Sequence, residues 1–375
     1  MSKKVVGVMF GGRSGEHEVS LKSAQSVMKT LLESNAYDVL PMGITKEGEW
    51  FCGSHAMKEL IDRADPGLLD GAASVDRNAI VFGDFPTVSS SPLPTPDIIK
   101  LIDVVFPVLH GPGGEDGTVQ GMLTIARVPF VGCNTLASSV AMDKIVFKNV
   151  MRAHDIPVLP DVTVLRSEWE SDRNFILSKI ESTLSYPVFC KPANMGSSVG
   201  ISKCRDRAEL TVGIDLASRF DRRILVELAA PKPREIEVSV LGNDQPIASI
   251  PGEIVPKREF YDYTAKYIDS GAAASDLLIP APIGEPEAHI IRDIAVRAFR
   301  AIDGSGMARV DFFIDRITGD LYLNELNTIP GFTAISMYSK LWAATGIPYP
   351  ELIDKLIELA VERFEETQRN QVSYM

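Results

Sequence analysis

The chain has 375 residues, 45% of them hydrophobic and 23% charged, which is typical of a globular protein of two or three domains. Lys and Arg number 38 and Asp and Glu number 50, so the net charge of −12 gives no overall attraction for nucleic acid or anionic lipid. No apolar run approaches the ~20 residues of a membrane helix. The four cysteines are scattered without a CxxC pair, so we expect a cytoplasmic protein without a zinc site. From the charge and the lack of a long apolar run we expect no nucleic-acid or membrane partner.

The first part of the chain alternates predicted strands with predicted helices. Residues 4–10 predict a buried strand, 18–34 an amphipathic helix and 102–111 a strongly apolar strand. This order predicts a parallel sheet covered by helices, with ligands at the carboxyl ends of its strands. Glu16 and His110 fall at those ends. Each also has a structural alternative: Glu16 as a partner of the helix dipole, and His110 as a packing residue.

From about Met142 the pattern changes to one typical of antiparallel α+β structure. The segment 252–276 is polar, aromatic and irregular, and a long irregular segment inside a compact domain is usually a functional loop or lid. The other predicted elements are a helix at 143–156, strands at 186–192, 201–204, 223–230, 234–243, 306–315 and 320–327, and a last helix from 350.

Two neighbouring predicted strands, 306–315 and 320–327, carry oxygen ligands. Glu325 and Asn327 are two residues apart and therefore share one face of their strand, which Asp311 can reach from the paired strand. Carboxylate and amide oxygens suit magnesium bridging nucleotide phosphates. The alternative is a pair of strands with incidental surface acids.

The sequence KPANMGSSVG follows an apolar strand and predicts a phosphate-binding loop. Gly196 and Gly200 let backbone N–H groups approach a ligand closely, Ser197 adds a hydroxyl, and Lys191 supplies a positive charge. The spacing differs from that of a Walker A loop. A flexible hairpin tip is the alternative for this loop, and a surface lysine is the alternative for Lys144 in the sequence MDK.

Taken together, these segments resemble the D-alanine–D-alanine ligase family of the ATP-grasp superfamily. The matching pieces occur in family order over nearly the whole chain: GGRSGEHEVSLKS, HGPGGEDGTVQGML, SSVAMDK, VFCKPANMGSSVGISK, REIEVSVLGN, FYDYTAKY, GMARVDFF and NELNTIPGFTAISMY. The resemblance implies an α/β and α+β fold of three domains, the ATP-grasp fold with an N-terminal Rossmann-like parallel sheet. We expect an N-terminal domain at 1–141 on the side of the first substrate. Next we expect a central ATP-grasp subdomain at 142–228. The last is a C-terminal ATP-grasp subdomain at 229–375, with the lid loop and the metal site.

The resemblance also implies how ATP and metal ions are held between the last two domains. The nucleotide-binding positions are matched by Lys144 and Lys191 for the phosphates, Glu227 for the adenine edge, Glu235 for the ribose and Phe260 for the adenine face. The positions that bind two Mg²⁺ ions, with Mn²⁺ as a possible substitute, are matched by Asp311, Glu325 and Asn327.

Further positions match the substrate-binding and catalytic residues of the family. They are Glu16, the anchor of the first ammonium group, with Ser197 and Tyr267 as its hydrogen-bonded partners; Arg309 and the N–H of Gly331, which stabilise the oxyanion; Lys266 and Ser336, which hold the second carboxylate; and His110, near the first substrate.

The resemblance implies a two-step reaction with ATP and D-alanine as substrates. The carboxylate of one D-alanine attacks the γ-phosphate of ATP, giving ADP and an acyl phosphate. The amine of a second D-alanine then displaces phosphate and forms D-alanyl-D-alanine for peptidoglycan precursor synthesis. The segment FYDYTAKY would close over the site and exclude water, which would hydrolyse the acyl phosphate. The resemblance further implies a homodimer.

Three other functions stay open at this point. D-alanine–D-lactate ligases are similar but carry a different residue at the position of Tyr267, so the tyrosine favours an amine as the acceptor. A more distant ATP-grasp carboxylate–amine ligase would not be expected to match the two N-terminal pieces. A non-catalytic nucleotide-binding relative would be expected to lack one of the metal-binding, lysine or arginine positions, and all of them are present.

Overall fold

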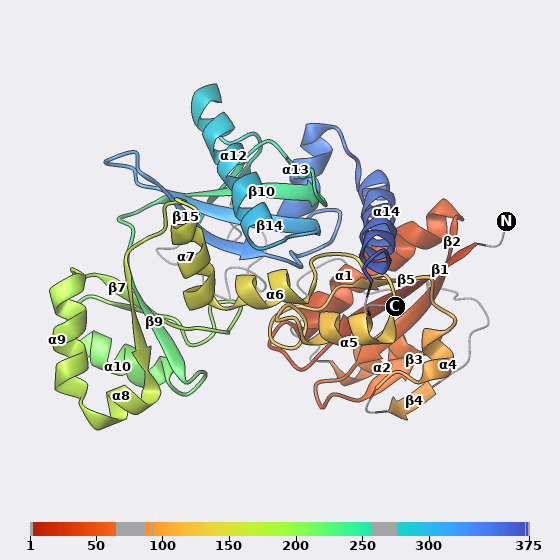
Figure 1. Cartoon of the computed structure of the whole chain (residues 1–375), viewed down its shortest axis with the longest axis horizontal. Helices are drawn as coiled ribbons and strands as arrows, with labels where there is room; N and C mark the ends of the chain where they lie inside the picture. Colours follow the sequence, from red (N-terminus) through yellow and green to blue (C-terminus); the bar gives the residue numbers. More distant parts are fainter. Residues whose placement is uncertain (1–2, 65–87, 92, 257–275, 372, 374–375) are drawn as a thin grey trace.

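A computed structural model describes residues 3–64, 88–91, 93–256, 276–371 and 373. Its three β-sheets follow one another along the chain, and the last sheet lies between the other two (Figure 1). The predicted site residues Phe260, Lys266 and Tyr267 lie outside the described residues. None of the helices that the structure describes is both long and apolar enough to span a membrane.

The first sheet has the strand order β4-β3-β2-β1-β5, and its central strands are parallel as expected. Two short strands, β3 and β4, extend one edge in antiparallel fashion, which the sequence did not predict. Its strands are β1 Lys4–Gly11, β2 Tyr37–Ile44, β3 Trp50–Cys52, β4 Val88–Ser91 and β5 Val104–Pro107. The helices of this region are α1 His17–Ser34, α2 Ala56–Arg63, α4 Pro96–Ile99 and α5 Thr118–Ala126.

The second sheet is antiparallel and has the order β6-β9-β7-β8. Its strands are β6 Asp161–Leu165, β7 Val188–Pro192, β8 Ser202–Cys204 and β9 Arg223–Leu228. Its helices are α8 Arg166–Ser171, α9 Arg173–Thr183 and α10 Arg207–Ala217. Because β7 and β8 form a hairpin, the loop predicted to bind phosphate lies at its tip.

The third sheet has the order β13-β12-β10-β14-β15, with β11 paired to β10. Its strands are β10 Arg234–Gly242, β11 Ile247–Ala248, β12 Gly252–Val255, β13 Asp276–Leu278, β14 Gly306–Ile314 and β15 Leu321–Asn327. Alternate residues of β10 and β14, such as Ile236 and Val310, join a buried core with α12 Glu285–Ala301. The residues between them therefore face the other side of the sheet, where the polar residues gather.

Several helices connect the three sheets. The α6 helix Thr135–Met142 contributes Ala137 to the core of the third sheet, and the α7 helix Lys144–Ala153 contributes Phe147 and Met151. The last helices, α13 Met337–Thr345 and α14 Tyr349–Gln368, share a buried core with α1 and β5 (Figure 1). The division into three domains stays a prediction. The α7 helix lies in the predicted central subdomain but packs against the third sheet, and α14 lies in the predicted C-terminal subdomain but also packs against the first sheet.

Candidate functional site

The polar face of the third sheet brings most of the predicted metal ligands together. Asp311 on β14 pairs with Glu325 on β15, and the Nδ2 atom of Asn327 donates to Oδ2 of Asp311 at 3.1 Å. A β-bulge follows, because Phe312 pairs with Leu323 rather than with the residue next to Glu325. Bulges often change the direction of a side chain beside a functional site.

Arg309 lies at the centre of this polar face. Its Nε and Nη2 atoms donate to the two carboxylate oxygens of Asp311 at 2.8 and 2.7 Å, and Nε lies 3.1 Å from Oε2 of Glu237. The Asp311 and Glu237 carboxylates hold the pKa of the arginine well above its usual value, although burial alone would lower it. Glu237 was not predicted, although its position on β10, two residues after Glu235, places both on one face.

The donor set suits a hard divalent cation that a nucleotide also binds. Among the described residues, no three His, Cys, Asp or Glu side chains lie close enough together to hold a metal by themselves. Asp311 and Glu325 provide carboxylates and Asn327 provides an amide oxygen. Magnesium commonly binds one or two carboxylates and completes its shell with water and phosphate oxygens. The residues therefore fit a magnesium ion that arrives with ATP.

Glu16 is the point where two loops from different parts of the chain converge. It precedes α1 and is buried, with 8% of its surface exposed. A Cβ atom added to Gly111 or to Gly196 would lie only 3.1 Å from its Oε2 atom. The loop after β5 and the loop after β7 thus both pack closely against this carboxylate. The close approach is possible because glycine has no Cβ atom.

Two further groups of the loop after β5 face the segment that follows β15. The Nδ1 atom of His110 donates to the carbonyl oxygen of Ile329 at 3.0 Å, and burial lowers the pKa of this histidine. The Glu115 carboxylate accepts the N–H of Ile329 at 3.3 Å and that of Gly111 at 2.7 Å. Burial, and next the charge of Glu16, raise the pKa of Glu115 to about 8. Glu115 was not predicted as a site residue.

The predicted nucleotide lysines lie beside the second sheet. Lys144 begins α7, and its Nζ atom donates to the carbonyl oxygen of Met195 at 2.6 Å, so it holds the loop after β7. The Nζ atom of Lys191 lies 2.5 Å from Oε2 of Glu227. Lys191 and Glu227 are therefore in contact, and Lys144 is bonded to the loop that follows Lys191. Glu235, in contrast, is the second residue of β10 on the third sheet.

A buried lysine that was not predicted completes this group. Lys148 is 2% exposed and forms an ion pair with Oε1 of Glu227 and a longer one, 3.5 Å, with Asp161. Burial lowers the pKa of Lys148 to about 8 against the opposing effect of Glu227. Burial alone would raise the pKa of Glu227, but Lys191 and Lys148 lower it to about 2. Glu227 is thus kept ionised between two ammonium groups.

The backbone of the loop after β7 is strained. Ser197 and Ser198 have φ values of 50° and 60°, a left-handed region that non-glycine residues rarely occupy. Gly196 and Val199 close a turn around them through a 3.1 Å hydrogen bond between backbone atoms. Strain of this kind persists where the surrounding structure requires it, and it is concentrated at ligand-binding sites.

The segment before α13 presents a hydroxyl group beside Gly331. Ser336 Oγ accepts the backbone N–H of Thr333 at 3.0 Å and lies 2.8 Å from the Oγ1 atom of Thr333. A Cβ atom on Gly331 would lie 3.6 Å from Ser336 Oγ. Ser336 Oγ therefore accepts one hydrogen bond from the backbone of Thr333 and shares a second with the Thr333 hydroxyl, in which either oxygen can be the donor.

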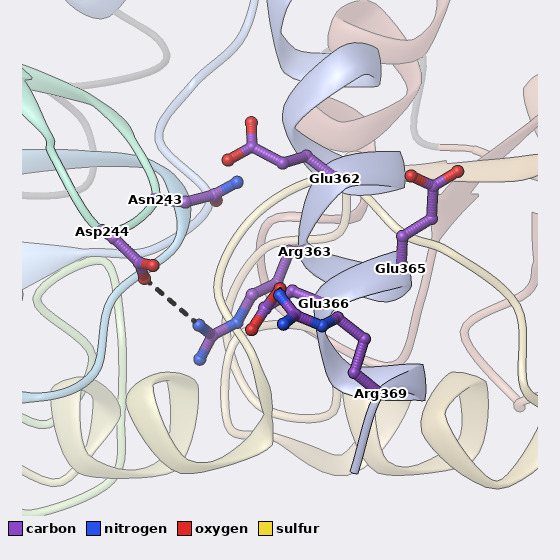
Figure 2. A pocket seen from close by; sticks show the side chains of 7 residues that line it. All are labelled: Asn243, Asp244, Glu362, Arg363, Glu365, Glu366 and Arg369. Carbon is purple, nitrogen blue, oxygen red and sulfur yellow. Dashed lines mark hydrogen bonds and ion pairs between the residues drawn. The ribbon is translucent and has the colours of Figure 1, made fainter.

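Two shallow surface hollows lie elsewhere and carry no comparable chemistry. Figure 2 shows the larger one, which lies beyond the end of β10, where Arg363 faces Asp244 at 3.6 Å. Arg363 also pairs with Asp303 at 2.9 Å, and Arg369 pairs with Glu366 at 2.6 Å. The other hollow is lined by His154, Arg297, Arg300 and Ala301. In the larger hollow these surface ion pairs balance the charges of both arginines.

Comparison with known proteins gives consistent matches over the whole chain. Family models described as D-ala D-ala ligase N-terminus and D-ala D-ala ligase C-terminus match residues 5–133 and 150–358. The chain is 50% identical over 370 residues to a D-alanine–D-alanine ligase of Heliobacterium modesticaldum, covering 99% of this chain and 98% of that protein. It is 47% identical over 383 residues to one of Natranaerobius thermophilus, covering 100% and 99%.

Two solved structures show the same arrangement at lower identity. The D-alanine–D-alanine ligase of Coxiella burnetii is 33% identical, with a TM-score of 0.77 and coverage of 98% of this chain and 97% of that one. A D-Ala:D-Ser ligase of Enterococcus faecalis is also 33% identical, with a TM-score of 0.79 and coverage of 96% and 100%.

Proposed function

The chain belongs to the D-alanine–D-alanine ligase family, and from this membership we propose that it joins two D-alanines to D-alanyl-D-alanine at the expense of ATP. The product serves peptidoglycan precursor synthesis. The observation that carries the proposal is the joint match of both family models to a chain whose fold is also that of solved relatives, the ATP-grasp fold. The convergence of two loops on Glu16 and the pairing of Asp311 with Glu325 support it.

In this proposal ATP binds between the second and third sheets. Lys144 and Lys191 neutralise phosphate charge, and the ionised Glu227 accepts a hydrogen bond from the amino group of adenine. Glu235 binds the ribose and Phe260 packs on the base. Two magnesium ions, replaceable by manganese, would be held by Asp311, Glu325 and Asn327. When bound they would neutralise the negative charge of the phosphates.

The first step is phosphoryl transfer to a carboxylate. Glu16, tied to Ser197 and Tyr267, holds the ammonium group of the first D-alanine, with His110 nearby. A carboxylate oxygen of this D-alanine forms a bond to the γ-phosphorus, and the bond to the ADP oxygen breaks. Arg309 would balance the charge on the second carboxylate oxygen. Positioning and charge balance account for most of the catalysis in such a transfer.

The second step joins the two substrates. The unprotonated amine of the second D-alanine attacks the acyl carbon, and phosphate leaves with its bonding electrons. The N–H of Gly331 and Arg309 stabilise the oxyanion that forms, while Ser336 and Lys266 hold the carboxylate of the acceptor. The segment with Lys266 and Tyr267 is proposed to exclude water, because water would compete for the acyl phosphate.

D-Alanine is the acceptor that the relatives favour. The curated relatives at 46–50% identity are named D-alanine–D-alanine ligases. Of the two solved structures at 33% identity, one is a D-alanine–D-alanine ligase and the other a D-Ala:D-Ser ligase. The purified protein should release phosphate from ATP only when D-alanine is present, and mass spectrometry should identify the dipeptide. Parallel reactions with D-serine and D-lactate as second substrates test the acceptor. Phosphate release independent of D-alanine, or a preferred product other than the dipeptide, would overturn the proposal.

We also propose a homodimer in the cytoplasm. Sedimentation of the purified protein at several concentrations tests the oligomeric state, and a monomer at all concentrations would exclude the dimer.

A further inference from the structure

One residue of the segment after β15 is held at both of its backbone groups by the N-terminal domain. The carbonyl oxygen of Ile329 accepts a hydrogen bond from His110 Nδ1 at 3.0 Å, and its N–H donates to Oε1 of Glu115 at 3.3 Å. The other oxygen of Glu115 accepts the N–H of Gly111 at 2.7 Å. His110 and Glu115 therefore form a clamp on Ile329, and we use the name Ile329 clamp for these two side chains.

The same segment is fixed a second time just beyond Gly331. Phe332 is fully buried, with its ring 5.4 Å from that of Phe106 on β5 and 5.5 Å from that of Tyr349 on α14. Its backbone N–H donates to Ser23 Oγ at 3.4 Å. Gly331 thus lies between two anchors, the Ile329 clamp on one side and the buried Phe332 on the other.

We propose that His110 and Glu115 are positioning residues for the ligase reaction, because the Ile329 clamp sets the direction of the Gly331 N–H that stabilises the oxyanion. The proposal rests on the function proposed above. A hydrogen-bond donor of this kind is effective only when it is already oriented before charge develops. With Phe332 as its only anchor, the glycine between them would retain rotational freedom.

The Ile329 clamp also connects the oxyanion donor to the anchor of the first substrate. Gly111 donates to Glu115, and its Cα atom packs against the Glu16 carboxylate, where an added Cβ would lie 3.1 Å from Oε2. The carboxylate that holds the ammonium therefore contacts the loop whose side chains orient the oxyanion donor. Their relative position sets the distance between the ammonium and the reacting carbonyl of one substrate molecule.

The substitution Glu115→Gln tests the Ile329 clamp with little change in shape. At an assay pH above the Glu115 pKa of about 8, the ionised carboxylate accepts both N–H groups, whereas an amide has one acceptor oxygen and turns its NH₂ group toward the other N–H. We expect kcat to fall roughly ten- to a hundredfold, as for a misplacement of about an ångström in a catalytic group. The KM values for ATP and for D-alanine should stay within about twofold, because the lost interaction acts in the transition state.

A matched control lies on the same loop. Asp116 also accepts two backbone N–H groups, those of Gly113 at 2.8 Å and Thr118 at 3.0 Å, and both belong to its own loop and the helix that follows. Asp116→Asn therefore disturbs the loop without touching Ile329, and its kcat should stay near that of the parent. His110→Asn keeps a donor near the position of Nδ1 and should retain more activity than His110→Ala.

Two readouts separate positioning from a structural role. The affinity for a phosphinate analogue of the dipeptide, which mimics the tetrahedral intermediate, should fall in Glu115→Gln by the same factor as kcat. Hydrogen exchange of the Ile329 amide should accelerate in Glu115→Gln but not in Asp116→Asn. Equal kcat in these two variants, or a loss in Glu115→Gln that lies entirely in KM, would overturn the proposal. A parent protein without dipeptide synthesis would instead refute the proposed function.

Discussion

Replacing Lys148 with methionine removes one of the two ammonium groups that keep Glu227 ionised. Methionine has a similar length and suits a site where the lysine is 2% exposed. In the variant, the carboxylate would remain buried, with 3% of its surface exposed, and Lys191 would be its remaining ion-pair partner at 2.5 Å. We expect the free energy of unfolding to fall, because a buried charge that loses part of its compensation is costly.

The size of the effect follows from what a buried charge costs when it loses a partner. The two lysines lower the pKa of Glu227 from 4.5 to about 2, which at about 1.4 kcal/mol per pH unit is roughly 3 kcal/mol of stabilisation. Burial lowers the pKa of Lys148 from 10.5 to about 8, a cost of roughly the same size, so the two pKa shifts nearly cancel and do not set the net effect. Removing one partner of a buried ion pair costs roughly 3–5 kcal/mol, and since Lys191 still compensates part of the charge, Lys148→Met should cost roughly 2–3 kcal/mol.

A double-mutant cycle in urea at pH 7.5 measures this coupling. The double variant Lys148→Met/Glu227→Gln should lie within about 1 kcal/mol of the parent, because it removes the costly charges together. Arg152→Met is the control on the same helix: its guanidinium pairs with Asp161 but is 41% exposed, so its loss should cost less than about 1 kcal/mol. Single-variant losses that add up in the double variant would refute the reasoning.

The pH dependence of the same pair has a definite sign. The folded-state pKa of Glu227 is depressed, so its stabilising contribution is complete above pH 4.5 and is lost as the pH falls toward 2. Glu227→Gln should therefore flatten this part of the acid limb of the unfolding curve. An unchanged acid limb would show that the carboxylate is not stabilised by its lysines.

Four further predictions concern the proposed reaction. Glu325→Gln should nearly abolish turnover with the fold intact, and full activity of the parent in chelator would refute the metal site. Lys191→Ala should lower ATP affinity and phosphoryl transfer about ten- to a hundredfold, as for a charge-assisted contact of roughly 1.5–3 kcal/mol; unchanged kinetics would make Lys191 structural. Thr333→Val removes the hydroxyl that is hydrogen-bonded to the Ser336 hydroxyl and should raise the KM for the second D-alanine about five- to tenfold, with recovery in Thr333→Ser; equal KM values in all three proteins would contradict this. Tyr267→Phe should increase the share of D-alanyl-D-lactate in competition between D-alanine and D-lactate, most clearly at lower pH, where the competing amine is protonated; a product ratio equal to that of the parent at every pH would exclude Tyr267 as the specificity residue.

The parts of the site that the sequence predicted best lie on regular strands. Glu325 and Asn327 are two residues apart, so in a strand they lie on the same face. The pairing of β14 with β15 brings Asp311 next to Glu325. The strand β1, the helix α1 and the strand β10 were predicted for the same reason, since their apolar residues follow the period of the element. The helix α12 was not predicted, although Ile291, Ala295 and Ala298 have helical spacing within it.

The residues that were missed depend on contacts between distant parts of the chain. Glu115 meets Ile329 across 214 positions, and no local pattern signals such a contact. Lys148 was detectable in part, because it follows Lys144 by four residues in a predicted helix and must share its face. Its burial, however, depends on β9 supplying Glu227 behind it. Sequence periodicity thus predicts which face a residue is on, and only the tertiary fold decides what that face meets.

Two cations of the proposed site are already paired with carboxylates in this structure. Lys191 is paired with Glu227, and Arg309 donates two hydrogen bonds to Asp311. A carboxylate has about four acceptor positions, and Arg309 and Asn327 use three of those of Asp311, so these two partners do not fill all of them. In the proposed function a metal held by Asp311 would share the negative charge of this carboxylate with Arg309. The guanidinium would then be held less strongly by Asp311 and would be easier to turn toward the carboxyl oxygen of the first D-alanine.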